Sequence, residues 1–174
     1  MCGLLAGACA AIDAAPMPAA PSAEAATLSA SRLLGQGAMR FLGMEIYQAR
    51  LWIAEDFDPR DYAHGALALE LRYARALYGR AIAERALQEM RRAGPLADAQ
   101  AEAWLALMLR AFPDVEAGQR LTGVLRGGQV RFFHEGRPTA STDDPDFARR
   151  FFGIWLAEWS SEPALRKHLL GGAP

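Results

Sequence analysis

Few side chains in this sequence have the spacing of a known catalytic or metal-binding motif. The G-x-S-x-G nucleophile motif, the G-x-x-x-x-G-K-S/T phosphate loop and the H-E-x-x-H zinc motif are all missing from the sequence. His64, His134 and His168 lie far apart, and their spacing predicts separate histidines rather than a metal site. Both cysteines, Cys2 and Cys9, fall within the first ten residues, which excludes a structural disulfide or Cys-ligated zinc from the rest of the chain.

Tyr47 is the residue we single out as a ligand contact. It lies in the stretch 45–53, where period-two alternation places it on one strand face with Ala49, Leu51 and Ile53. A phenol on an apolar face can donate a hydrogen bond to a ligand oxygen in a hydrophobic cleft. The alternative is a core tyrosine whose hydroxyl is satisfied inside the protein.

Three charged residues of the same region have two interpretations each. Arg40 and Arg50 are strand arginines, which are either solvated or shaped to clamp a carboxylate in a bidentate manner. Glu45 shares the strand face of Tyr47 and is either the wet end of the strand or a carboxylate of a site.

The charge balance argues against nucleic acid as a partner. The 174 residues hold 19 basic and 20 acidic side chains, and the basic residues form no cluster. The apolar run at residues 1–12 is too short for a transmembrane helix, which takes about 20 apolar residues.

The elements that would carry these residues follow from the hydrophobic period. We expect extended structure over 33–54, a strand over 67–73 with one face toward solvent, and a hairpin from 121–125 and 129–134, followed by a turn at Gly136 and Pro138. Helices are expected from Gly79 to about 94, from about 96 to 111, from Pro145 onward, and over a short segment near Ser161. This order favours an α+β fold with an antiparallel sheet covered on one face by helices.

The first 29 residues have the composition of an export-signal remnant or of an Ala/Pro-rich tail, and the folded domain is expected over 30–174. The triplet Ala23-Glu24-Ala25 fits an A-x-A cleavage site with processing near Ala26, which would place the protein in the periplasm. Cys9 follows small residues, as in a lipoprotein signal. A cytoplasmic protein with a disordered tail is the remaining alternative.

Several stretches together resemble the chalcone isomerase-like family, and more narrowly its short bacterial branch of exported proteins. The resemblance covers residues 33–171 in order. It rests on 40–52 (RFLGMEIYQARLW), 68–73 (ALELRY) before a helix, 112–115 (FPDV), 118–121 (GQRL), 130–136 (VRFFHEG) and 151–156 (FFGIWL) before Leu165.

The resemblance implies an open-faced β-sandwich, in which a large antiparallel sheet is backed by helices. It also implies a cleft between them that holds a flavonoid in the plant enzymes and a fatty acid in their plastid relatives, with no cofactor. Tyr47 stands where the plant enzymes have a Thr, and it matches the Tyr of the fatty-acid-binding relatives. The family Arg falls on Gly37, and Arg40 substitutes for it only if a bulge intervenes.

The set that cyclises chalcones is therefore incomplete in this sequence, since the helix over 78–87 also lacks the Tyr and Asn of the plant enzymes. Only Thr139, Ser141 and Thr142 are candidates for the late Thr. We predict a non-catalytic member that binds a small lipophilic, fatty-acid- or flavonoid-like ligand through Tyr47 and Arg40. The alternatives are an envelope interaction protein without a ligand and a weak chalcone isomerase.

Overall fold

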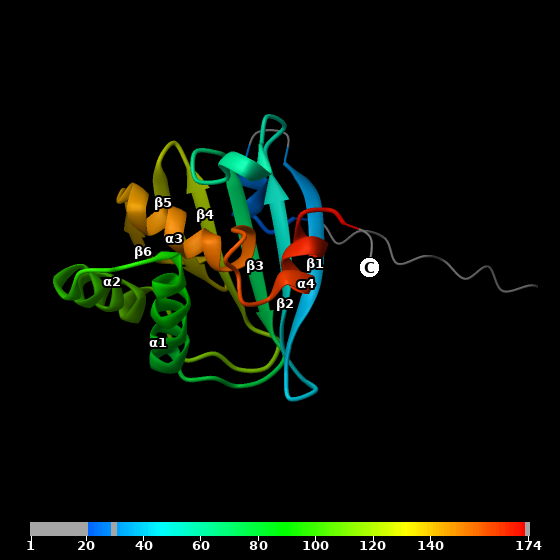
Figure 1. The fold of residues 1–174 in the computed structure, drawn as a ribbon. Helices are drawn as coiled ribbons and strands as arrows, with labels where there is room; N and C mark the ends of the chain where they lie inside the picture. Colours follow the sequence, from blue (N-terminus) through cyan, green and yellow to red (C-terminus); the bar gives the residue numbers. More distant parts are fainter. Residues whose placement is uncertain (1–20, 29–30, 173–174) are drawn as a thin grey trace, which may run out of the picture.

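The computed structural model describes residues 21–28 and 31–172, which form one antiparallel sheet with a layer of helices (Figure 1). The sheet has the strand order β1-β2-β3-β4-β5-β6. Its strands are β1 (Arg32–Phe41), β2 (Met44–Ile53), β3 (Leu67–Tyr73), β4 (Arg120–Arg126), β5 (Gln129–His134) and β6 (Arg137–Thr142). The helices are α1 (Gly79–Met90), α2 (Asp98–Ala111), α3 (Pro145–Leu156) and α4 (Pro163–Leu169), with short 3₁₀ turns at Ala25–Thr27, Pro59–Asp61 and Arg91–Ala93. The predicted α+β class and the open, helix-backed antiparallel sheet are confirmed.

Two turns differ from the sequence prediction. The extended stretch 33–54 is a hairpin, divided at Leu42 and Gly43, whose φ angles are 49° and 78°. The expected turn at Gly136 and Pro138 is in part a sixth strand, because the turn lies at Glu135-Gly136 and Pro138 belongs to β6. A proline is tolerated there because β6 is an edge strand, which does not need every backbone donor.

The second face of the sheet is covered over its middle strands, so the predicted solvent-facing side of β3 is wrong. Residues 21–28 lie across this face, and Ala25 and Leu28 pack with Trp52 and other apolar side chains of the middle strands. The backbone N–H of Ser22 donates to Glu70 Oε1 at 3.1 Å, which gives the buried carboxylate a partner. These residues belong to the segment 1–29 that the sequence assigned to a signal or tail; Cys2, Cys9 and the apolar run at 1–12 lie outside the described residues.

Helix α3 begins as the sequence predicts. The Asp144 carboxylate caps it by accepting hydrogen bonds from the backbone N–H groups of Asp146 and Phe147, at 2.9 and 3.1 Å. Its other oxygen accepts from Trp104 Nε1 of α2 at 2.8 Å. Phe147, Phe151 and Trp155 recur at helical spacing and are buried against the sheet, as expected for a packing face.

Helix α4 lies directly on β1, and two glycines allow this close approach. A Cβ atom on Gly35 would lie 2.0 Å from the His168 carbonyl oxygen, and one on Gly37 would lie 2.8 Å from Leu165 Cδ1. Gly35 and Gly37 therefore allow α4 to pack directly on β1. Within the described residues, no helix combines the length and apolarity needed to cross a membrane.

Candidate ligand cavity

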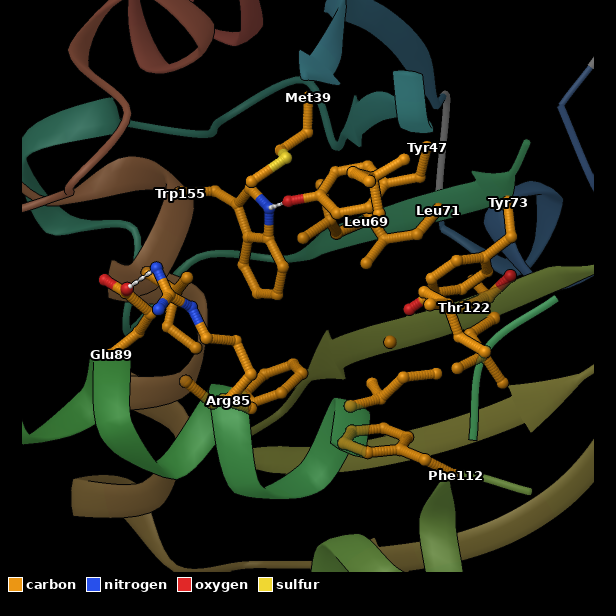
Figure 2. A pocket seen from close by; sticks show the side chains of 18 of the residues that line it. Met39, Tyr47, Leu69, Leu71, Tyr73, Arg85, Glu89, Phe112, Thr122 and Trp155 are labelled. Carbon is orange, nitrogen blue, oxygen red and sulfur yellow. Dashed lines mark hydrogen bonds and ion pairs between the residues drawn. The ribbon is translucent and has the colours of Figure 1, made fainter. Parts of the chain in front are cut away.

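A cavity of about 270 Å³ lies between the sheet and the helix layer (Figure 2). Its walls come from strands β1 to β5 and helices α1 and α3, and they are formed mainly by apolar and aromatic side chains. They include Met39 of β1, Ile46 and Tyr47 of β2, Leu69, Leu71 and Tyr73 of β3, Ile82 and Ala86 of α1, and Phe151, Ile154 and Trp155 of α3.

The cavity exists because α1 does not pack closely on the sheet. Helix α1 makes its main contacts with α2 and α3, and it presents the small side chains of Ala81 and Ala86 to the space in front of the strands. Helix α3, in contrast, fills the region beside it with stacked rings of Phe147 and Phe151. The short side chains of Ala81 and Ala86 beside the large rings of α3 leave space for a ligand between α1 and the sheet.

Tyr47 lies in the cavity wall, where the alternation of β2 predicted an apolar environment. Its hydroxyl oxygen accepts a hydrogen bond from Trp155 Nε1 at 3.0 Å (Figure 2). Its ring meets that of Tyr73 edge-on, with the centroids 5.8 Å apart. Burial raises the pKa of Tyr47 to about 12, against a smaller lowering by the Trp155 hydrogen bond. The phenol is therefore neutral at ordinary pH, and its O–H has no acceptor among the described residues.

A group of charged residues lies at one end of the cavity. Arg85 and Glu89 of α1 form an ion pair at 2.5 Å (Figure 2). Ser161 and Glu162 of the α3–α4 connection also line the cavity. The Glu89 side chain is only 9% exposed, and its second oxygen lies 3.6 Å from Arg92 Nε. Sequence analysis missed this group, because the helical period assigns Arg85 and Glu89 to the solvated face of α1.

Arg40, the second predicted ligand contact, does not line the cavity. The strand register pairs Met39 with Tyr47 and Arg40 with Glu45, so the extra residue of the bulge is Ile46 in β2. Strand β1 keeps its alternation from Gly35 onward, which turns Arg40 away from the helix layer and places Met39 in the cavity wall. The Arg40 guanidinium is 66% exposed and lies 3.6 Å from the Glu45 carboxylate.

The remaining candidates also lie outside the cavity. Glu45 accepts a hydrogen bond from Gln48 Nε2 at 2.6 Å, so it is the polar end of the strand rather than a carboxylate of the site. Thr139 donates to the carbonyl oxygen of Ala111. The described part of the chain contains no group of three or more His, Cys, Asp or Glu side chains placed to hold a metal ion, and His64 pairs with Asp61.

A family model described as chalcone isomerase-like matches residues 12–171. The chain belongs to the chalcone isomerase-like family. The crystal structure of a fatty-acid binding protein of Arabidopsis thaliana resembles this chalcone isomerase-like chain in fold, with a TM-score of 0.61 over 81% of this chain and 87% of the other. Their sequences are 13% identical, so the likeness concerns the fold alone. A comparison with curated proteins gives no match.

Proposed function

We propose that this chalcone isomerase-like chain binds a small lipophilic ligand, fatty-acid- or flavonoid-like, in the cavity between sheet and helices. One observation carries the proposal: a mainly apolar cavity of about 270 Å³ whose wall holds the Tyr47 hydroxyl and, at one end, the Arg85–Glu89 ion pair (Figure 2). That volume is near the lower limit of the roughly 300–1,000 Å³ range of small-molecule sites. The structural neighbour described as a fatty-acid binding protein supports the same class of ligand.

The polar groups favour binding over catalysis. With a pKa of about 12, Tyr47 acts as a neutral hydrogen-bond donor and not as a general base near neutral pH. The Glu89 carboxylate is already engaged by the Arg85 guanidinium, which leaves it as one half of an ion pair at the cavity wall. We assign Tyr47 the role of donating a hydrogen bond to the polar end of the ligand.

We further propose that the protein is exported to the periplasm and is one of the short bacterial exported members of the family. The Ala-rich, apolar composition of residues 1–20 supports export. Processing near Ala26 would remove Ser22, which donates to Glu70, and the buried Ala25. The intact mass of protein recovered from the periplasm distinguishes cleavage near Ala26 from cleavage before Ser22, and an unprocessed cytoplasmic mass would contradict export.

Native mass spectrometry of the full chain, purified without detergent, is the experiment that tests ligand binding. We expect an added mass of a few hundred daltons, and a saturable thermal shift when delipidated protein is titrated with a fatty acid or a flavonoid. Tyr47→Phe should weaken a ligand with a polar oxygen by about tenfold, the value of one lost hydrogen bond.

A matched pair of variants separates the cavity from the surface. Ala86→Leu adds apolar atoms to the cavity wall and should abolish the ligand-induced shift, whereas Ala106→Leu on the exposed side of α2 should leave it unchanged. An apo mass together with no shift for any ligand would refute the proposal. Loss of chalcone absorbance above the uncatalysed rate would instead identify an isomerase, and a defined protein complex without a ligand would identify an interaction protein.

A further inference from the structure

The large apolar side chains that remain exposed are concentrated at one tight turn. Among the described residues these are Phe41, Leu42, Met44 and Tyr78, with exposed fractions of 58, 82, 45 and 77%. We call the first three the apolar tip: Leu42 lies in the two-residue turn between β1 and β2, and Phe41 and Met44 flank this turn. Figure 1 shows this turn projecting at the end of the sheet where α1 begins.

We propose that the apolar tip inserts into the interface of a lipid bilayer, so that the cavity exchanges its ligand with the membrane. The inference deepens the proposed function and rests on it for the ligand. Its physical basis is the position of the tip, the choice of residue in the turn and the charge around it.

Leu42 contradicts the local rules of a hairpin turn. Both turn residues have positive φ, 49° at Leu42 and 78° at Gly43, and this backbone is normally built from Asn, Asp or Gly. The leucine gains no burial within the chain in return for the strained backbone, since it is the most exposed of the large apolar residues. A strained residue without an internal contact points to a requirement outside the folded chain.

The apolar tip and part of the cavity wall belong to the same hairpin. The same two strands supply Met39, Ile46 and Tyr47 to the cavity wall, a few residues from the turn. The loop leading to α1 is joined to this hairpin, because the Ala74 N–H donates to the Ile46 carbonyl oxygen at 2.9 Å. We therefore place the entry of a lipophilic molecule from the bilayer at this end of the hairpin, a few residues from the cavity wall.

The charges beside the tip favour insertion into a bilayer by apolar contact. Arg40 and Glu45 compensate each other, and Arg75 reaches the Met44 sulfur with Nη1 at 3.5 Å. One uncompensated arginine beside three apolar side chains suits an interfacial anchor, since an arginine can extend toward the headgroups. A projecting turn of this size offers a folded protein far less than the roughly 1,000 Å² of a stable interface. Binding should therefore occur on zwitterionic lipid and depend little on salt.

Flotation of the full-length protein with phosphatidylcholine vesicles tests this inference. Leu42→Asn removes the apolar side chain while placing a residue suited to positive φ, and Phe41→Ser removes a second apolar group without touching the turn. We expect each variant to lose about tenfold in vesicle binding, the value of one buried leucine or phenylalanine side chain. Ala106→Ser on α2 serves as the control and should bind vesicles like the wild type.

The outcomes separate the two proposals. Lost vesicle binding with an unchanged ligand-induced thermal shift in the Leu42 and Phe41 variants supports docking. Leu42-dependent vesicle binding by a chain that binds no ligand would retain the docking element and refute the proposed function. Docking is overturned if the wild type does not float, if both variants float equally well, or if the apolar tip instead forms a dimer that Leu42→Asn dissociates.

Discussion

Replacing Tyr47 by Phe should change the pH dependence of stability in a way that the cavity geometry specifies. At neutral pH the variant loses the acceptor of Trp155 Nε1, which is 3.0 Å from the hydroxyl oxygen. An unsatisfied buried donor costs about 1–3 kcal/mol, and we expect the lower end of this range, about 1 kcal/mol, because the Phe ring keeps the packing of the Tyr ring.

At alkaline pH the order reverses. The pKa of Tyr47 is about 12 in the folded protein against 10.0 for a free tyrosine, because burial disfavours the phenolate. A raised folded-state pKa gives stability that is fully present below pH 10 and is lost as the pH rises through about 12. The full loss is about 3 kcal/mol in the wild type and is absent from Tyr47→Phe. The two stability curves should therefore cross at about pH 11.

Urea unfolding followed by tryptophan fluorescence, at intervals between pH 7 and pH 12, measures both curves. Tyr73 is present in both proteins, and the raising of its pKa by burial, which is the main cause, cancels in the comparison; only the smaller raising by Tyr47 is lost in the variant. Parallel curves up to pH 12 would show that Tyr47 titrates as in water, and would refute the assignment of a dry cavity wall around it.

Two further predictions concern the scaffold around the cavity. Asp144→Ala removes the cap of α3 and the acceptor of Trp104, and should lower the free energy of unfolding by about 2–4 kcal/mol, with Asp144→Asn falling between it and the wild type. Leu28→Ala should lower it by about 2 kcal/mol because Leu28 is buried against the second face of the sheet, while the exposed Ala26→Ser should change it little. Chemical denaturation measures both, and an unaffected Leu28→Ala would mean that residues 21–28 are not part of the folded domain.

Much of the fold follows from local patterns in the sequence. Strand β3 has the residues that its alternation predicts, and α3 begins where Asp144 and Pro145 predict a capped start. The turn at Leu42-Gly43 is not predicted from the sequence, because leucine is not a typical turn residue. Strand β6 is not predicted because Pro138 suggests a turn. The packing of residues 21–28 on the second face is not predicted, because an Ala-rich segment has the composition of a tail. Ala25 and Leu28 are buried by tertiary contacts, which local composition does not reveal.

The candidate site is likewise predicted only in part from the sequence. The strand face of Tyr47 follows from the sequence, because alternation within one strand decides it. Arg40 lies outside the cavity wall because the extra residue of the bulge is in the partner strand, at Ile46. The place of Arg85 and Glu89 in the cavity wall is not predicted, because helical spacing identifies the face of a residue but not the distance between the helix and the sheet.

The position of the cavity also bears on how the protein folds. The cavity wall crosses the pairing of β3 with β4, since Leu69 and Leu71 lie on one side of it and Leu121 on the other. Strands β1–β3 and β4–β6 are each joined by shorter connections, but residues 74–119, which hold α1 and α2, separate β3 from β4. Closing that long loop is the slow, non-local step of assembling the sheet. A ligand in the cavity would therefore bind only a chain in which both three-stranded halves have joined. Its binding would stabilise the pairing of β3 with β4.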